Sequence, residues 1–321
     1  MENVKKRKKE KEQKEKLTPE KLMKRIIRYK EFYIMFIPVI LFFVVFHYLP
    51  MLGIRMAFYK YEYVYAAKSF QMTEFIGLQN FRDLLNSPKF WQVFSNTIII
   101  SITNLAIGLI VAVTFALLLN ELKAGIFKKS IQTISYLPHF LSWVVVASIF
   151  TMILSPQNGI VNAIIEKFGG EPIYFMASSK WWRKVFYISY IWKNMGWSTI
   201  VYLAALTSID PTLYEAASID GAGRLRQTIS ITIPSILTTI LVVLIMDLSK
   251  VLNIFEPVFV FQNSMVYEVS DVIGTYTYRL GLLKSDYSYS TAVGLFKSVV
   301  AMVLVLGANK LSNKIKGESI L

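Results

Sequence analysis

The sequence contains six stretches in which about twenty consecutive residues are predominantly apolar. They run over residues 32–54, 94–119, 135–154, 185–206, 235–261 and 289–311. The hydrocarbon core of a bilayer is about 30 Å thick, so one helix needs roughly 20 apolar residues to cross it. Because a membrane leaves no water to satisfy an exposed backbone, such stretches fold as helices that pair their own N–H and C=O groups. The pattern predicts an all-α, polytopic membrane protein with six transmembrane helices.

Composition favours one bundle of such helices over a soluble domain. Of the 321 residues, 54% are hydrophobic, with 22 Phe and 18 Tyr, whereas soluble domains average about 45–50% apolar residues. The chain contains no Cys, which excludes disulfides and thiolate metal sites. His47 and His139 are its only histidines. A histidine metal cluster is therefore not expected either, and we predict no metal site.

Positive charge is concentrated near the N-terminus. Residues 1–31 hold 13 Lys or Arg, well in excess of their acidic residues, and lead directly into the first span. Because such charge stays on the cytoplasmic side, we expect 1–31 to be a basic cytoplasmic tail and 32–321 the transmembrane domain. Alternating six spans from this tail places 21 Lys or Arg inside and 10 outside, which predicts that both termini are cytoplasmic. The position of the tail against a span also argues against a nucleic-acid partner.

The segments expected outside the membrane carry short helices of their own. Residues 75–91 and 159–168 have amphipathic helical patterns. Five tryptophans also fall at or near span ends, where aromatic side chains anchor helices at the membrane–water interface. They are Trp91, Trp181, Trp182, Trp192 and Trp197. Interfacial anchoring is the ordinary role of such residues, and stacking on sugar rings is the alternative.

A polar segment separates the fourth span from the fifth and is expected on the cytoplasmic side. Asp210 and Pro211 predict a helix start, since the carboxylate accepts free backbone N–H groups and proline has none to satisfy. The helix is expected over 211–219, followed by a glycine turn at 220–223 and by a second helix that Pro234 ends. On these features alone the segment could be an ordinary connection between spans.

Seven residues of this segment keep a characteristic spacing. They are Glu215, Ala216, Ala217, Asp220, Gly221, Ile231 and Pro234. This spacing resembles the EAA loop of permease subunits in binding-protein-dependent ABC importers, and residues 215–234 are called the EAA loop below. Ile233 stands where the family usually has Leu. The loop also lies between the third-last and second-last spans, as the family requires.

Further matches extend over most of the chain. They are Gly77-Leu78-Gln79-Asn80-Phe81, Ser95-Asn96-Thr97, Gly159-Ile160-Val161-Asn162 and Ala292-Val293-Gly294-Leu295-Phe296-Lys297. These segments look like the sugar-importer branch of the maltose-transporter-like superfamily. The whole pattern is most similar to permeases for oligosaccharides or polysaccharides, and the tail through about residue 28 lies outside the resemblance.

The resemblance implies a transport subunit with defined partners. A second permease subunit, expected to be a different chain, would pair with it in a bacterial cell membrane, and an extracytoplasmic binding protein would deliver the oligosaccharide. The EAA loop would dock on a cytoplasmic ABC ATPase dimer. The sequence has no G-x-x-x-x-G-K-[ST] phosphate loop. ATP would therefore be hydrolysed by the partner chain, and we expect no cofactor, no catalytic residue and no enzyme activity in this one.

Ionisable and polar residues inside the spans are candidates for the substrate path, because charge at mid-membrane is costly and faces protein or water. The candidates are Trp192, Lys193, Asn194, Trp197, Asp247, Lys250 and Asn253, with Phe255 and Glu256 further along the fifth span. Asp247 and Lys250 are three residues apart on the expected helix, so a structural ion pair is the alternative. A cationic Lys193 or Lys250 would suit a uronate-containing oligosaccharide. Helix packing is the common role of the uncharged candidates.

Two other classes of membrane protein are compatible with the hydropathy. An ion-coupled secondary transporter could use Asp247 as its ion site, but it predicts an internal repeat between halves, which the sequence lacks. A membrane enzyme acting on glycans or lipids would need clustered Asp, Glu or His at one membrane face, whereas the carboxylates here are scattered. The sequence therefore favours the permease, with the secondary transporter as the alternative.

Overall fold

The computed structural model describes residues 23, 27–65 and 67–316, with the backbone alone for 311–316. The chain forms two units, residues 1–55 and 56–321. The expected basic tail lies almost entirely outside the described residues.

The first predicted span is present as a long apolar helical run over Lys30–Phe58. It begins as α3 (Lys30–Phe43), continues through a π-helical turn at Val44–Tyr48 and ends in 3-10 geometry over Leu49–Phe58. Pro38 lies inside α3, which membrane helices tolerate. None of the α3 side chains is buried, so this helix has an apolar surface that suits a membrane.

Three further helices are long and apolar enough to cross a membrane, and they contain most of the second, fifth and sixth predicted spans. They are Pro88–Glu121, Arg224–Leu248 and Tyr287–Lys310. The first of them, α5 (Pro88–Glu121), is capped by Ser87, whose Oγ accepts a hydrogen bond from the N–H of Phe90 at 3.2 Å. Pro88 occupies the first turn, where no N–H is needed.

The third predicted span, 135–154, is not one straight helix. α6 (Ile126–Tyr136) leads into a 3-10 turn at Leu137–Phe140, and α7 (Trp143–Ile153) leaves at an angle of 104°. The helix restarts at Ser142, because its backbone is extended and its Oγ caps α7. α7 has only 11 residues, about 17 Å, so α6 and α7 make at most one broken span. The described part of the chain thus has four candidate spans, or five with this pair.

α9 (Ser179–Thr207) contains the fourth predicted span but begins earlier along the chain. At 29 residues it is long enough to cross a bilayer. It is less apolar than the four helices above, because Lys180, Arg183, Lys184 and Lys193 lie along it.

The fifth span departs from the prediction at both ends. α11 (Arg224–Gln227), a π-helical turn at Thr228–Thr232 and α12 (Ile233–Leu248) form one continuous helix, so Pro234 does not end it. Proline lacks the N–H that would bond to a carbonyl four residues earlier, and the π-helical turn lies where that bond is missing. At its other end α12 stops short of the predicted boundary, and the chain turns into a separate helix, α13 (Glu256–Phe261).

The segments predicted outside the spans are only partly helical. The expected helices are present as α4 (Gln79–Asn86) and α8 (Ile160–Lys167). The all-α prediction is wrong before α4, where β1 (Tyr59–Val64) and β2 (Ser69–Phe75) form an antiparallel hairpin. Tyrosines alternate with other residues along β1, which is the period-two pattern of a strand. This signal is too short to stand out beside the long apolar runs.

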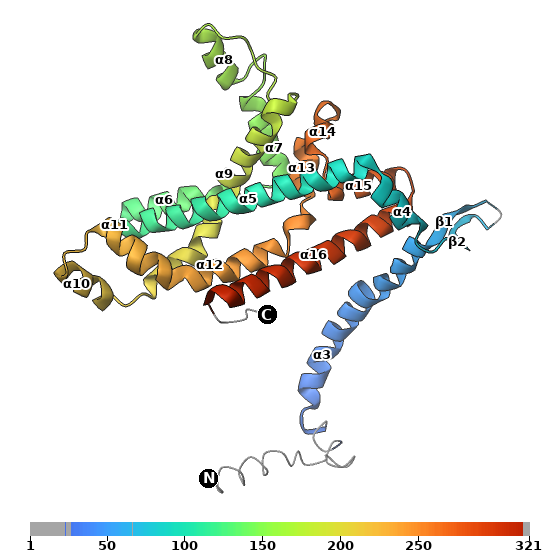
Figure 1. The fold of residues 1–321 in the computed structure, drawn as a ribbon, viewed down its shortest axis with the longest axis horizontal. Coiled ribbons are helices and arrows are strands. Elements are labelled where there is room, and N and C mark those ends of the chain that lie inside the picture. Colours follow the sequence, from blue (N-terminus) through green and yellow to red (C-terminus); the bar gives the residue numbers. More distant parts are fainter. Residues whose placement is uncertain (1–22, 24–26, 66, 317–321) are drawn as a thin grey trace. The chain divides into compact units, whose positions relative to one another are not determined.

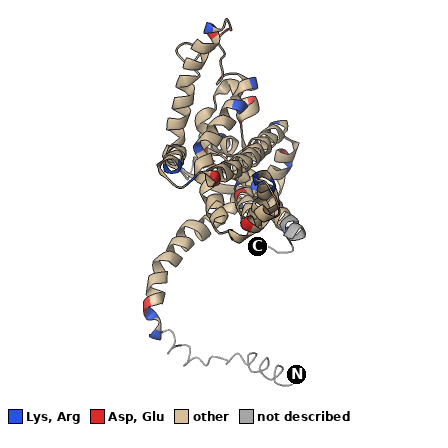
Figure 2. Cartoon of the chain, turned by 90° about the vertical axis from the view of Figure 1, so that its left-hand side faces the viewer, with Lys and Arg blue, Asp and Glu red and all other residues tan. Residues whose placement is uncertain are grey.

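Within the described part of residues 56–321 the buried apolar side chains gather where α5, α9 and α12 meet, around α7, α9 and α13, and at the start of α5. α12 packs beside α5, α9 and α16 (Tyr287–Lys316) (Figure 1). Near the start of α5 the chain adds two short helices, α14 (Tyr267–Ser270) and α15 (Ile273–Tyr278). Long stretches of helix carry no charged side chain (Figure 2). Buried polar side chains are therefore informative in this bundle, and places where several of them gather are candidate sites.

Candidate functional site

The EAA loop lies on two helices, the first of which is α10 (Thr212–Ile219). The Asp210 carboxylate accepts a hydrogen bond from the backbone N–H of Thr212 at 2.9 Å. This bond lowers the pKa of the Asp210 carboxyl below its usual range. Pro211 immediately precedes the helix. The start that the sequence predicts is therefore present, within one residue of the expected boundary.

α10 ends in the glycine turn that the sequence also predicts. Gly221 has a φ of +78°, a left-handed conformation that glycine adopts without steric cost. The N–H of Ala222 donates to the carbonyl of Ala217 at 2.8 Å, and the N–H of Gly221 donates to that of Ser218 at 3.1 Å. These two bonds form a Schellman motif. The middle of the EAA loop is consequently a well-defined corner.

Side chains hold the two helices of the loop in one arrangement. Nε2 of Gln227 donates to the hydroxyl of Ser218 and to the carbonyl of Ala222, both at 2.9 Å. Arg224 pairs with Glu121 at the end of α5, with 3.2 Å between nitrogen and oxygen. This exposed pair places the loop beside the end of α5.

The outer surface of the loop is open. Glu215 and Ala216 are exposed, and Glu215 forms none of the ion pairs found among the described residues. Ile219 and Leu225 leave 87% and 75% of their surface uncovered. Of the other predicted residues, Ala217 and Ile231 are half-buried, and Asp220, Gly221 and Pro234 are exposed. A carboxylate beside exposed apolar side chains is a surface that suits another protein.

A cavity of about 670 Å³ lies between α5, α9, the end of α12 and the start of α13. Its size is typical of small-ligand sites. Five predicted substrate-path residues line it, as do Phe255 and Glu256. The five are Asn194, Trp197, Asp247, Lys250 and Asn253. The fold therefore brings two distant parts of the sequence together around one space.

The α5 wall of this cavity carries two polar side chains that sequence reasoning missed. Ser101 and Asn104 are only 5% and 4% exposed, and both line the cavity. The Ser101 hydroxyl and both polar atoms of the Asn104 amide lack a hydrogen-bond partner among the described residues. Each such group in a native protein calls for an explanation, and a polar ligand would supply it. Two polar residues one turn apart in an apolar span are the signal that could have found them.

An aromatic pair forms another part of the wall. The ring of His139 stacks on the indole of Trp197, with centroids 4.6 Å apart and planes at 2°. Tyr190 and Tyr202 of α9 also line the cavity. Flat aromatic faces beside amides and hydroxyls are the groups that bind a sugar ring and its hydroxyls.

Two predicted substrate-path residues lie elsewhere. Lys193 is buried, and its Nζ donates to the carbonyls of His139 and Leu141. The ring of Trp192 packs edge-on against Phe150 of α7, with centroids 5.9 Å apart. Neither side chain lines the cavity. Trp192 lies on the far side of α9 from Asn194 and Trp197, whereas Lys193, one turn before Trp197, is directed to the carbonyls of the turn after α6.

Contrary to the prediction from sequence, Asp247 and Lys250 do not share one face of a single helix. Asp247 lies in the last turn of α12, and Lys250 follows the end of that helix. The N–H of Lys250 donates to the backbone oxygen of Asp247 at 3.0 Å. Their side chains form none of the ion pairs found among the described residues. Both remain available to the cavity.

Comparison with known sequences identifies the family. The pattern of the binding-protein-dependent transport system inner membrane component matches residues 105–317, which include the EAA loop and most of the cavity wall. The chain belongs to this family. It is thus a multi-pass inner-membrane permease, the transport subunit of an ABC importer, and ATP is handled by a separate ATPase.

Two curated relatives match the permease over almost its whole length. It is 42% identical over 301 residues to the polygalacturonan/rhamnogalacturonan transport system permease protein YteP of Bacillus subtilis (strain 168), covering 94% of this chain and 93% of that protein. It is 40% identical to protein LplB of the same organism, covering 91% of this chain and 92% of that one.

Solved structures show the same fold. One is the crystal structure of a bacterial ABC transporter involved in the import of the acidic polysaccharide alginate. The matching chain has a TM-score of 0.84 and 40% identity, covering 92% of the permease and 99% of that chain. The other is a bacterial alginate ABC transporter in complex with an alginate pentasaccharide-bound periplasmic protein. The matching chain has a TM-score of 0.85 and 39% identity, covering 93% of the permease and 99% of that chain.

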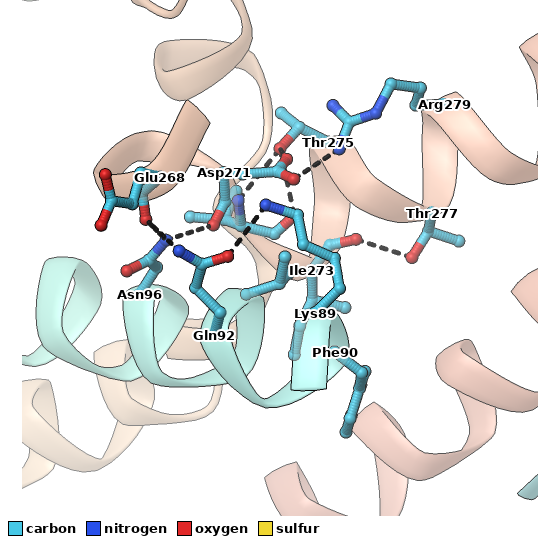
Figure 3. A network of polar contacts seen from close by, with 12 residues as sticks. Lys89, Phe90, Gln92, Asn96, Glu268, Asp271, Ile273, Thr275, Thr277 and Arg279 are labelled. Atoms are coloured by element: carbon cyan, nitrogen blue, oxygen red, sulfur yellow. Dashed lines mark hydrogen bonds and ion pairs between the residues drawn. The ribbon is translucent and has the colours of Figure 1, made fainter. Parts of the chain in front are cut away.

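A polar network ties α5 of the permease to the segment that holds α14 and α15 (Figure 3), and Arg183 joins α9 to it. Nη2 of Arg183 donates to Oδ1 of Asn96 at 2.7 Å, and its Nε donates to the carbonyl of Val269 at 3.0 Å. Asn96 in turn donates from Nδ2 to the carbonyls of Glu268 and Asp271, at 2.9 and 3.1 Å. One asparagine thus joins three parts of the fold.

A buried ion pair completes this network. Asp271 is fully buried, and its carboxylate pairs with Arg279 and accepts a hydrogen bond from the Thr275 hydroxyl at 2.8 Å. The hydroxyl of Thr97 accepts from the N–H of Ile273 at 2.8 Å. A buried charge is tolerated when it is paired and hydrogen-bonded in this way. The network therefore fixes the 267–279 segment against α5, close to the end of α5 opposite the EAA loop.

Proposed function

We propose that the permease imports an acidic oligosaccharide and that the cavity lined by Asn194, Trp197, Asp247, Lys250 and Asn253 belongs to its path. The composition of the cavity wall is the main support. Aromatic faces, Lys250, and the Ser101 hydroxyl and Asn104 amide, which have no partner among the described residues, surround a space of about 670 Å³. A sugar can stack on the aromatic faces and satisfy the unpaired polar groups with its hydroxyls.

The relatives and Lys250 support an acidic substrate. Permeases of this similarity belong to a polygalacturonan/rhamnogalacturonan system and to an importer of the acidic polysaccharide alginate. Lys250 lines the cavity, and its ammonium can bind a sugar carboxylate through a charge-assisted hydrogen bond. Asp247 and Glu256 share the wall, so we assign them to sugar hydroxyls, which donate to carboxylates.

The EAA loop is proposed to dock on the ABC ATPase dimer. Glu215 would meet a basic group of the ATPase, while Ile219 and Leu225 enter an apolar groove of it. The Arg224–Glu121 pair would pass movement of the loop to α5, whose other face lines the cavity. Nucleotide can then shift the bundle between two arrangements through its different affinity for each.

We also propose six spans with both termini in the cytoplasm. α9, the fourth span in chain order, would bring the four candidate spans and the broken α6–α7 pair to six. Its 29 residues measure about 44 Å, more than a bilayer core of about 30 Å. The basic tail would stay inside. A second permease, expected to be a different chain, would complete the path, and an extracytoplasmic binding protein would deliver the sugar.

The substrate is tested with the reconstituted importer, including its partner permease, ATPase and binding protein. ATP hydrolysis is measured with binding protein loaded with oligogalacturonate or with a neutral maltooligosaccharide of equal length. We expect stimulation by the acidic oligomer alone, and a reduced preference for it in Lys250→Gln. Equal stimulation by both sugars would overturn the acidic assignment.

The role of the EAA loop is tested by co-purification. We expect tagged Glu215→Lys permease to lose the ATPase, because a positive charge would face the basic group assumed to receive Glu215. Glu166→Lys on α8 is the matched control, since Glu166 is also exposed but lies on a different surface helix. If Glu215→Lys retains the ATPase as well as this control does, the docking proposal is wrong.

A further inference from the structure

The β1–β2 hairpin has one aromatic and one polar face. Side chains alternate along each strand, and cross-strand pairs share a face. Tyr63 is paired with Phe70, Tyr61 with Met72 and Tyr59 with Phe75. The apolar face therefore consists of Tyr59, Tyr61, Tyr63, Phe70, Met72 and Phe75, and is called the aromatic face below. The opposite face carries Lys60, Glu62, Val64, Ser69, Gln71 and Glu74.

A bulge keeps the aromatic face continuous. The register shifts between Lys60 and Tyr61, which leaves Thr73 unpaired in β2. Without the extra residue, Phe75 would project from the polar face, because a shift of one residue reverses every side chain beyond it. The hydroxyl of Thr73 instead bonds to the carbonyl of Lys60 at 3.1 Å and to Glu62 at 3.2 Å. The sequence thus contains a specific device that gathers the aromatic rings on one side.

The permease itself covers only part of the aromatic face. Tyr287, the first residue of α16, contacts Tyr61 and Phe70 edge-on, with ring centroids 5.8 and 5.2 Å apart. Phe75 nevertheless leaves 67% of its surface exposed and Tyr63 leaves 42%. A two-stranded hairpin is only marginally stable without a surface to pack on, so this face needs a further partner.

The hairpin is attached to the ends of two candidate spans. β1 begins at Tyr59, directly after the apolar helical run Lys30–Phe58 ends. On its other side, the N–H of Tyr61 donates to the hydroxyl of Ser288 at 2.8 Å, in the first turn of the candidate span Tyr287–Lys310. Both attachments lie at an end of a candidate span, which is where a span would meet water.

Lipid suits this face better than a charged protein partner does. Tyrosines, with an apolar ring and a polar hydroxyl, are enriched at the membrane–water interface. On the polar face Lys60 and Glu62 form an ion pair at 3.0 Å, and Lys68 and Glu74 bring the remaining charges of 59–75 into balance. The hairpin therefore has no net charge with which to attract a partner of opposite sign.

We infer that the β1–β2 hairpin lies on the membrane surface, with its aromatic face in the lipid headgroup region and its polar face toward water. It acts as an interfacial anchor beside the start of α16. This role depends on the membrane location alone, so it stands or fails independently of the proposed substrate.

Site-directed spin labelling tests the inference, and because this sequence contains no Cys, the permease can be labelled at the introduced cysteine before it is assembled with its partners. Tyr63→Cys and Phe75→Cys place a nitroxide on the aromatic face, and Gln71→Cys places one on the polar face as the matched control. The assembled importer is reconstituted in nanodiscs of phosphatidylethanolamine and phosphatidylglycerol. Collision of each label with oxygen, which concentrates in lipid, is compared with collision with a water-soluble nickel chelate.

We expect labels at 63 and 75 to collide mainly with oxygen and to lose access to nickel, and the label at 71 to show the reverse. Equal access of nickel to both faces would overturn the anchor. Protection at 63 and 75 that appears only after binding protein is added would also overturn it, because the face would then be a protein-docking surface. Retained ATPase activity of each variant shows that the importer is folded. A second measurement uses the conservative substitution Tyr63→Trp, whose indole fluorescence should be quenched by brominated lipid.

Discussion

The ammonium nitrogen of Lys193 lies 2.6 Å from the backbone oxygen of His139. It also donates to the carbonyl of Leu141 at 2.7 Å. These carbonyls belong to the turn between α6 and α7, where the ending helix leaves acceptors without intrahelical donors. Lys193 is 5% exposed and lies 5.4 Å from the ring centroid of Trp143. A buried lysine on α9 therefore bonds to the bend of the broken span.

Removing this lysine should destabilise the permease. Lys193→Met keeps the apolar stem but leaves two carbonyls without their donor, and we expect a loss of about 2 kcal/mol in the free energy of unfolding. Thermal or denaturant unfolding in detergent measures the change. Lys180→Met, on the same helix but exposed, is the control and should have little effect. A Lys193→Met variant as stable as this control would show that the bend does not depend on the lysine.

α6 and α9 are also in contact at a glycine that admits no side chain. A Cβ placed on Gly196 would lie 2.1 Å from the backbone oxygen of Ser135, a distance that forces the two helices apart. We expect Gly196→Ala to lower the unfolding midpoint and to reduce transport, because it displaces the cavity wall on α9. Gly294→Ala on α16 is the control, since a Cβ there would meet no atom within 4 Å. Equal behaviour of the two variants would contradict this close packing.

The elements that the sequence predicts correctly are those set by local chemistry. Asp210 with Pro211 and the glycine at 221 determine where α10 begins and ends, because a cap and a left-handed residue act within a few positions. The long apolar runs likewise predict α5 and α16. Hydropathy cannot distinguish a straight span from a broken one. The bend before α7 combines a local cap, Ser142, with hydrogen bonds from Lys193 on α9. A hydropathy window around the bend does not include Lys193.

The cavity was predictable only in part for the same reason. Asn194 and Trp197 line the cavity, whereas Trp192 lies on another face of α9 and the buried Lys193 is engaged by the turn after α6. The helical period alone predicts neither which face lines a cavity nor which side chain another element engages. Asp247 and Lys250 were placed on one helix because the end of α12 carries no strong stop signal. Ser101 and Asn104 give a sequence signal as two polar residues one turn apart in an apolar span, but their burial without partners among the described residues is visible only in the structure.

Asn96 should control how firmly the 267–279 segment is held. Asn96→Ala removes an acceptor for Arg183 and donors to the carbonyls of Glu268 and Asp271. We expect a stability loss of about 2 kcal/mol and faster proteolysis within this segment. Gln92→Ala loses two exposed bonds, one to the carbonyl of Glu268 at 3.2 Å and one from Lys89 at 3.0 Å, and should change stability and proteolysis much less. Unchanged proteolysis in Asn96→Ala would show that packing, and not this asparagine, holds the segment.

The cap of α10 predicts a dependence on pH. The hydrogen bond from Thr212 lowers the pKa of Asp210, so the capping contribution is full above the ordinary aspartate pKa of about 3.9 and is lost as pH falls through the lower, folded value. At neutral pH we expect Asp210→Ala to reduce ATPase coupling because α10 frays, while Asp210→Asn keeps the acceptor and most of the coupling. The stability difference between wild type and Asp210→Ala should shrink in acid. If the stability difference between wild type and Asp210→Ala stayed constant as the pH fell below about 3.9, the charged cap would be contradicted.

Asn104 offers a separation of folding from transport. Its buried amide has no partner among the described residues. Asn104→Leu replaces this unsatisfied amide by an apolar side chain of similar volume, so the free energy of unfolding should be unchanged or raised. If the amide binds a sugar hydroxyl, the same substitution raises the KM of ATP-dependent uptake roughly tenfold, which corresponds to one hydrogen bond of about 1.4 kcal/mol. Thr103→Val, one residue away but outside the cavity lining, is the control for substitutions in α5 and should keep the wild-type KM. A destabilised Asn104→Leu with normal uptake would instead assign the asparagine to helix packing.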